Sequence, residues 1–288
     1  MSATTKTLAT APFAVATQCR RYEGRVVVVT GAAQGLGRVI ARRLAEEGAK
    51  VAVADVQEER AKRTAAQLER ETGMPFLAAG GDLSVPGVTD ALVARTIERF
   101  GQVDTLVNNA AALIRMPLGE FSEELMQKAV AGNVWTTLRA CKSVLPHMLE
   151  RGYGRIVNVA GEAWRLGTPF HTLVGGIGKG SMVGLTATLA GEAVRRGITV
   201  NCISPGTFEN EADGDPDGER PSYRDPAWNP PEVMDALMKM VVAAGAATGI
   251  GRMAHPTEVA AAVAFLGAPE ASYVTGQHFG VSGGMAMV

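Results

Sequence analysis

The sequence is short of cysteine, of net charge and of long apolar runs, and each shortage argues against a class of function. Its three cysteines, Cys19, Cys141 and Cys202, are far apart and odd in number. This usage indicates a reducing compartment such as the cytoplasm and offers no metal-binding motif. The net charge of -1 gives no electrostatic basis for binding nucleic acid or an anionic membrane. No continuous apolar run approaches the roughly 18 residues that a membrane-spanning helix needs.

The remaining composition is that of an ordinary globular protein, with 47% hydrophobic and 20% charged residues among 288. The first 22 residues are small, rich in Thr and Ala, and lack acidic side chains. We expect residues 1–23 to be a flexible extension. A cleaved targeting peptide is the alternative, but the apolar stretch APFAVA is short and its arginine pair follows it rather than precedes it.

From Arg25 onward, short apolar runs alternate with longer helical patterns. The run RVVVVT is typical of a strand buried on both faces, and LGRVIARRLAEEGA has the spacing of an amphipathic helix. Strands that alternate with helices predict βαβ units. We therefore expect an α/β fold, a Rossmann-like doubly wound parallel sheet, in a single domain over residues 24–288. The predicted strands are residues 25–30, 50–55, 75–82, 104–109, 154–160, 197–206 and 276–284.

One long segment interrupts this alternation. Residues 207–231 are acidic and rich in proline, and they directly follow a predicted strand. A loop of this length inside a compact domain is usually a lid, a binding loop or disorder. Because open α/β sheets bind ligands at the carboxyl ends of their strands, we interpret residues 207–248 as a substrate-loop insertion, with a solvated surface insertion as the alternative.

The first strand is followed by a glycine-rich turn, TGAAQGLG, at residues 30–37. Gly31, Gly35 and Gly37 allow a tight turn, close approach of a ligand to the backbone, and packing of the next helix. The start of that helix offers free N–H groups and a positive dipole end to a pyrophosphate. A glycine pattern between a strand and a helix therefore predicts a dinucleotide site.

The choice between the two nicotinamide dinucleotides follows from Asp55, which ends the second predicted strand 20 residues after Gly35. A carboxylate at this position accepts hydrogen bonds from the adenosine ribose and repels a 2′-phosphate. The nearby Gln34 and Val56 bring no positive charge to offset that repulsion. We therefore predict NAD rather than NADP as the cofactor.

With these motifs, the chain resembles the short-chain dehydrogenase/reductase family over residues 24–288. The segment NNAA at 108–111 is similar to the family's NNAG, and GRMAHPTEVAAAVAFL resembles its carboxyl-terminal signature. The resemblance implies that Asn133 and Lys179 match the catalytic asparagine and lysine, with the lysine also holding the nicotinamide ribose. The implied cofactor-binding set is Gly31, Gln34, Gly35, Leu36, Gly37, Asp55, Asp82, Leu83, Asn109, Ala110, Lys179, Pro205 and Gly206.

Two other catalytic residues of the family are missing. The family's tyrosine stands four residues before its lysine, where this chain has Gly175. The stretch that matches the catalytic serine reads IVNVAGE, so Ala160, Gly161 or Glu162 takes its place. Of the four tyrosines, only Tyr223, in the predicted substrate loop, is placed to reach the cleft.

Two titratable residues near the missing tyrosine are candidates for its role. Glu162 is expected at the carboxyl end of the fifth strand, and His171 shortly before the fifth helix. Histidine has the more suitable pKa, whereas a glutamate needs burial to raise its own. The alternatives are a structural hydrogen-bond acceptor for Glu162 and a surface or capping residue for His171. The glycines around Lys179 are expected to admit either a larger substrate group or a neighbouring helix.

Three functions fit these observations. The first is an NAD-dependent oxidoreductase acting on the hydroxyl or carbonyl group of a small molecule, with a non-standard acid–base residue. The second is a lyase, dehydratase or isomerase that retains NAD, and the third is an inactive nucleotide-binding relative. In each case we expect a homodimer or homotetramer formed through the fourth and fifth helices, as the resemblance implies. The acidic segment 207–231 argues against a strongly anionic substrate.

Overall fold

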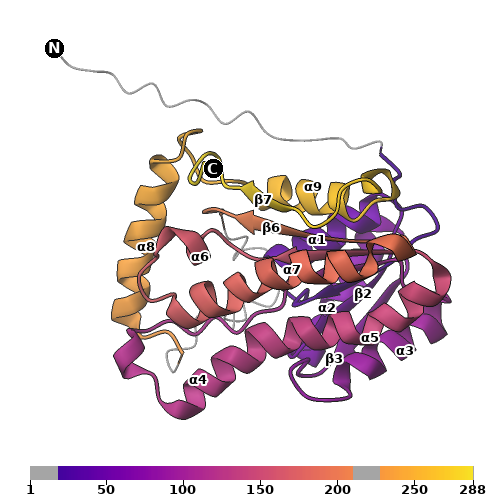
Figure 1. The fold of residues 1–288 in the computed structure, drawn as a ribbon, viewed down its shortest axis with the longest axis horizontal. Coiled ribbons are helices and arrows are strands. Elements are labelled where there is room, and N and C mark those ends of the chain that lie inside the picture. Colours follow the sequence, from indigo (N-terminus) through magenta and orange to yellow (C-terminus); the bar gives the residue numbers. More distant parts are fainter. Residues whose placement is uncertain (1–18, 210–227, 288) are drawn as a thin grey trace.

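The computed structural model describes residues 19–209 and 228–287, which form a seven-stranded parallel sheet with helices on both faces (Figure 1). The strand order is β3-β2-β1-β4-β5-β6-β7. The chain therefore winds from the centre to one edge, returns, and winds to the other edge, which confirms the predicted Rossmann-like doubly wound fold. The strands are β1 (Val26–Thr30), β2 (Lys50–Asp55), β3 (Phe76–Gly80), β4 (Thr105–Asn108), β5 (Gly154–Val159), β6 (Ile198–Pro205) and β7 (His278–Val281).

The helices cover the two faces of the sheet in separate groups. α1, α2 and α9 pack on one face, where Val27, Val29 and Val51 point, and α3, α5 and α7 pack on the other, against Val28 and Ala52. Covering on both faces explains why these strands lack polar alternation. The helices are α1 (Gly35–Glu46), α2 (Glu58–Thr72), α3 (Val88–Phe100), α4 (Glu123–Val130), α5 (Thr136–Arg151), α6 (Ala163–Leu166), α7 (Gly180–Ala193), α8 (Pro231–Ala246) and α9 (Pro256–Leu266).

Two of the connections are π-helical, with a wider turn than an α-helix. Residues Ala131–Trp135 join α4 to α5, and residues Thr172–Lys179 lead directly into α7. Such wide turns are frequent at functional sites. They follow β4 and β5 in the chain, and β4 lies beside β1, where the strand order reverses and where doubly wound sheets bind ligands.

The segment predicted as a substrate loop contains a long helix. α8 occupies its second half and lies near α6, away from α3 (Figure 1). Phe208 forms a bridge with Ala254, so the segment leaves β6 close to the chain that precedes α9. Residues 210–227, with Tyr223 and most of the predicted acidic residues, lie outside the described residues.

The predicted amino-terminal extension overlaps the folded domain. Tyr22 is fully buried, and its hydroxyl donates to the Ala264 carbonyl at 2.8 Å. Arg21 forms an ion pair at 2.6 Å with the buried Glu47. The ordered domain therefore includes residues 21–23, while residues 1–18 lie outside the described part.

One helix within the described ranges has the length and mean hydropathy of a membrane-crossing segment, although its sequence contains no continuous apolar run. This helix, Thr172–Arg196, combines the π-helical turns with α7. Met182, Leu189 and Ala190 on it are buried against the sheet and neighbouring helices. Its apolar composition therefore matches its place as a core helix of the domain.

Candidate active site

A cleft of about 1250 Å³ opens at the carboxyl ends of the strands and is large for a small-molecule site. It is lined by every residue of the predicted cofactor set, which lies on six separate segments of the chain. Two of the catalytic candidates, Glu162 and His171, also line it, whereas Asn133 does not. All the predicted site residues except Asn133 therefore meet in one cleft.

The glycine turn is as compact as the motif predicts. Gly31 and Gly35 have φ values of 63° and 53°, in the left-handed region that favours glycine. A Cβ on Gly31 would lie 2.7 Å from the Ala110 Cα, and a Cβ on Gly37 would lie 2.2 Å from the Gly31 oxygen. These positions accept no larger residue without displacing backbone, so the turn keeps its N–H groups accessible at the start of α1.

Asn109 fixes this turn against the loop after β4. Its Nδ2 donates to the carbonyls of Thr30 and Gly31, both at 3.0 Å. The Thr30 hydroxyl in turn accepts from the backbone N–H groups of Asn109 and Ala110. The amide of Asn109 therefore shapes the glycine turn, which is a positioning role within the predicted cofactor set.

Asp55 is buried at the end of β2, with its carboxylate held by backbone. One oxygen accepts from the N–H of Ala33 at 3.1 Å and the other from the N–H of Gln57 at 3.0 Å. Burial raises the pKa of the carboxyl, while these N–H groups and the charge of Arg60 lower it. Asp55 also lines the cleft, so its carboxylate is within reach of a ligand hydroxyl.

Arg60 is a cation near Asp55 that the sequence analysis missed. It is buried, and it donates to the Gln34 side chain at 2.6 Å. It is absent from the residues that line the cleft. Its charge lowers the pKa of Asp55, while its guanidinium is bound to the Gln34 side chain.

Lys179 projects into the cleft from the last π-helical turn. Its Nζ donates to the carbonyl of Val159, the last residue of β5, at 2.8 Å. The pKa of this lysine is lowered to about 8, mainly by burial and to a smaller extent by the charge of Arg115. Both protonation states of Lys179 are therefore populated near neutral pH.

Asn133 lies behind the cleft, because its side chain is fully buried. Its Nδ2 donates to the carbonyls of Ala112 and Ala129 at 2.9 and 2.8 Å. Its Oδ1 has no hydrogen-bond partner among the described residues. The side-chain amide therefore ties the chain after β4 to the end of α4, just before the π-helical turn that carries Asn133.

Glu162 is likewise occupied. Its carboxylate is buried and forms a two-pronged ion pair with Arg165 at 2.5 and 3.0 Å. One carboxylate oxygen also lies 2.8 Å from where a Cβ on Gly280 of β7 would stand. These contacts favour the structural alternative for Glu162, since a paired carboxylate directed at β7 is poorly placed to exchange protons with a substrate.

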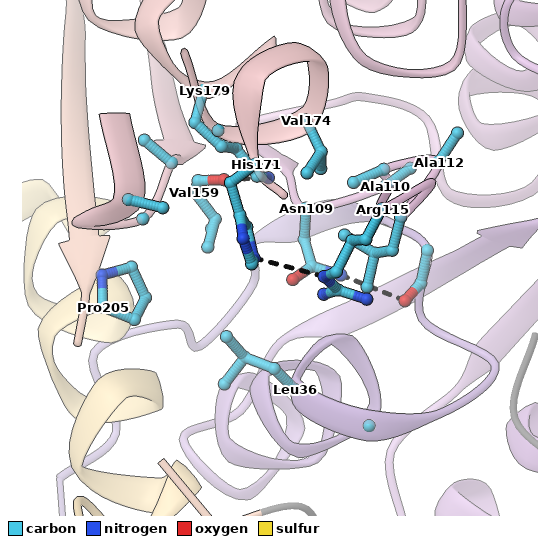
Figure 2. A pocket seen from close by; sticks show the side chains of 18 of the residues that line it. Leu36, Asn109, Ala110, Ala112, Arg115, Val159, His171, Val174, Lys179 and Pro205 are labelled. Carbon is cyan, nitrogen blue, oxygen red and sulfur yellow. Dashed lines mark hydrogen bonds between the residues drawn. The ribbon is translucent and has the colours of Figure 1, made fainter. Parts of the chain in front are cut away.

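Both ring nitrogens of His171 are engaged. Nδ1 lies 2.8 Å from the Pro169 carbonyl, so it carries the proton, and Nε2 accepts from Arg115 Nε at 3.2 Å (Figure 2). Burial, together with the charge of Arg115, lowers the pKa of the ring to about 4, although the Pro169 carbonyl opposes this. His171 is therefore neutral at pH 7, and its lone pair is directed at a cation.

The glycines beside Lys179 differ in how much space surrounds them, so they serve different structural purposes. A Cβ on Gly178 would lie 2.7 Å from the Asn133 Cβ, so this glycine lets two π-helical turns touch. A Cβ on Gly175 would lie 3.0 Å from the Cβ atoms of Ala163 and His171, so that space is already filled, whereas Gly176 has none of the described atoms within 4 Å. The expected approach of a neighbouring helix holds for Gly178, and the expected open volume at Gly175 is absent.

The substrate side of the cleft contains residues that the sequence analysis did not single out. Arg115 donates to Asn229 at 3.4 Å in addition to His171, and Lys128 stacks on the Trp228 ring at 4.4 Å. No local motif marks these residues, which meet only through the fold. An apolar wall completes this side, formed by Trp228, Met234, Leu237, Met238, Val241 and Met253.

The glycine turn, the buried carboxylate at the end of β2 and the lysine in the cleft together define a dinucleotide-binding α/β protein. A sequence profile described as enoyl-(acyl carrier protein) reductase matches residues 31–286. The chain belongs to the short-chain dehydrogenase/reductase family. Proteins of this family use nicotinamide dinucleotides and act on small molecules.

Relatives with assigned names are oxidoreductases. The chain is 34% identical to 2,3-dihydroxy-2,3-dihydro-p-cumate dehydrogenase of Pseudomonas putida, over 92% of this chain and 96% of that one. It is 33% identical to 3-oxoacyl-(acyl-carrier-protein) reductase of Vibrio cholerae, over 92% and 99%. The crystal structure of levodione reductase superposes with a TM-score of 0.79 at 30% identity, covering 91% of this chain and 98% of that one.

Proposed function

We propose that this protein is an NAD-dependent oxidoreductase that interconverts a hydroxyl and a carbonyl group on a small molecule. The observation that carries the proposal is the placement of Asp55 in the same cleft as the glycine turn and Lys179. Gly31 and Gly37 form a cradle that a Cβ would fill, which fits a pyrophosphate against the start of α1. When bound, NAD supplies the hydride acceptor for the chemistry.

The preference for NAD over NADP rests on charge. A buried carboxylate accepts hydrogen bonds from the two ribose hydroxyls, whereas a 2′-phosphate brings a second anion against it. Among the described residues that line the cleft, the cations are Arg115, Lys128 and Lys179. All three lie on chain that follows β4 or β5, and β1 separates those strands from β2, which ends in Asp55. The charge of Arg60 is already directed at Gln34 and Gln57.

The substrate end favours an apolar molecule that carries a hydroxyl or a carbonyl group. The apolar wall on α8 and Trp228 supplies most of that surface, and the relative from Pseudomonas putida is named for a ring-shaped vicinal diol. We propose cyclic diols, secondary alcohols and the corresponding ketones as the compounds to test.

Calorimetric titration with NADH and NADPH, followed by assays of that panel, tests the proposal. We expect NADH to bind at least tenfold more tightly than NADPH, and NADH to form when a member of the panel is oxidised. Binding of NADH without turnover of any alcohol or ketone would favour the lyase, isomerase or inactive alternatives. The missing tyrosine and the engaged side chains of Glu162 and His171 are the observations that keep those alternatives in view.

We also propose that the protein is a cytoplasmic homodimer or homotetramer. Trp135, Leu138 and Ile177 are 39–50% exposed on the α5 and α7 side of the sheet, as an interface between copies requires. The free thiols of Cys141 and Cys202 are buried and suit a reducing compartment. Sedimentation at micromolar concentration tests the assembly, and a monomer would contradict it.

A further inference from the structure

The site lacks the family's tyrosine, and the geometry narrows the search for a replacement. Glu162 is held in a two-pronged ion pair with Arg165. His171 donates from one ring nitrogen to a carbonyl and accepts a guanidinium N–H at the other. A group that exchanges protons with substrate needs a site free to meet the substrate's oxygen. The ion pair with Arg165 and the contact with Arg115 hold both side chains in place and disfavour that role for either.

Lys179 does offer such a site. Within the described ranges, its ammonium makes one hydrogen bond, to the carbonyl of Val159. An ammonium has three N–H donors, so two remain for groups in the cleft. Lys179 lines the cavity, and so do Val159, whose carbonyl it contacts, and Gly175, one helical turn earlier. The substrate's oxygen can therefore meet Nζ directly.

We propose that Lys179 is the acid–base residue of this site, exchanging an Nζ proton directly with the oxygen of the substrate. The inference rests on the proposed oxidoreductase function. In oxidation, neutral Nζ takes the hydroxyl proton as the C=O bond forms, and the hydride from the same carbon passes to NAD⁺, which becomes NADH. The alcohol is oxidised, NAD⁺ is reduced, and the new ammonium then releases its proton to water. Reduction runs through the same steps in reverse.

The electrostatic surroundings of Lys179 suit this role. Burial and the charge of Arg115, on the chain after β4, lower its pKa. The Cys202 thiol has a pKa raised to about 12 by its own burial, so it is uncharged over the working range. His171, at the start of the same helix, is neutral at pH 7. A general acid–base residue works best with a pKa near the operating pH, and about 8 meets that condition.

The first test compares Lys179→Arg with wild type on the substrate found in the panel. Arginine keeps the positive charge but does not release its proton. We expect NADH affinity within about threefold of wild type, and kcat lower by about 10²–10⁴-fold, the usual contribution of general acid–base catalysis. Lys142→Arg, on the exposed side of α5, makes the same chemical change away from the cleft and is expected to behave as wild type.

The second test restores the proton acceptor from solution. Lys179→Ala is assayed at saturating NAD⁺ with methylamine, ethylamine and the weaker base trifluoroethylamine. We expect amines to raise turnover, with a rate constant that grows with amine basicity in the oxidation direction. In wild type, log kcat for oxidation should rise with pH and level off above about 8. A residue that only positions the ribose would give neither the amine dependence nor this break.

The outcomes separate this inference from the function on which it rests. If the wild type turns over substrate, the role of Lys179 is overturned in either of two cases: Lys179→Arg keeps nearly full activity, or no amine restores activity to Lys179→Ala. The proposed oxidoreductase function stands in both cases. A wild-type protein that binds NADH but oxidises or reduces nothing in the panel contradicts the proposed function, and the inference falls with it.

Discussion

Removing the carboxylate of Asp55 should collapse the preference for NAD. The carboxylate is buried, fixed by backbone N–H groups, and lines the cleft, so it is held in place for a ligand. Hydrogen bonds to a charged group contribute about 1.5–3 kcal/mol. Asp55→Ser should therefore weaken NADH binding by about 10- to 150-fold. NADPH should bind more tightly than it does to wild type, because its 2′-phosphate no longer faces an anion.

The assay is calorimetric titration of wild type and variant with each dinucleotide, at a temperature where thermal melting shows both to be folded. Glu59→Gln is the matched control, since it removes an exposed carboxylate from the adjacent α2 without touching the cleft. Its two affinities should equal those of wild type. An Asp55→Ser variant that still prefers NADH by the wild-type ratio would refute the charge reasoning.

Three further substitutions test the geometry. Gly178→Ala should lower the free energy of unfolding by about 1–3 kcal/mol in urea titrations, because the new Cβ would lie 2.7 Å from the Asn133 Cβ. Gly176→Ala is the control and should cause no such loss, because none of the described atoms lies within 4 Å of the new Cβ. Equal losses in the two variants would contradict this. Gly37→Ala should abolish NADH binding or folding, since its Cβ would meet the Gly31 oxygen at 2.2 Å, and calorimetry or melting detects either. The pKa of His171 is 6.5 in the unfolded chain and about 4 in the folded protein. Between these pH values the unfolded chain binds more protons, so the free energy of unfolding decreases as the pH falls from 6.5 to about 4. His171→Gln should remove up to about 3 kcal/mol of that decline, and an unchanged pH profile of unfolding would refute it.

Much of the fold was predictable because its signals are local. The run KVAVAD predicts β2 over Lys50–Asp55, and VVVVT predicts β1, since continuous apolar segments rich in valine suit strands covered on both faces. Gly31 and Gly37 were readable for the same reason. Both glycines belong to one strand–turn–helix unit, and the glycine spacing that this unit needs can be recognised within a few residues of sequence.

The catalytic half of the site was less predictable, because its contacts join residues far apart in the chain. His171 looked suited to proton exchange by its ordinary pKa, but Arg115, which occupies its Nε2, comes from a loop 56 positions away. The partner of Glu162 is only three residues off, yet the short α6 that aligns Arg165 with it has no clear sequence signal. The lowered pKa of Lys179 likewise follows from burial, which the chain reveals only once folded.

Detection of hydride transfer is the most direct test of the proposed oxidoreductase activity. The protein is incubated with NADH deuterated on the nicotinamide carbon that carries the hydride, together with each ketone of the panel, and the products are examined by mass spectrometry. If the protein is an NAD-dependent oxidoreductase, we expect one ketone to become an alcohol that carries deuterium on its carbinol carbon, with an equal amount of NAD⁺ formed. Tight binding of NADH with no deuterium in any product would contradict it and place the chain among the non-redox members of its family.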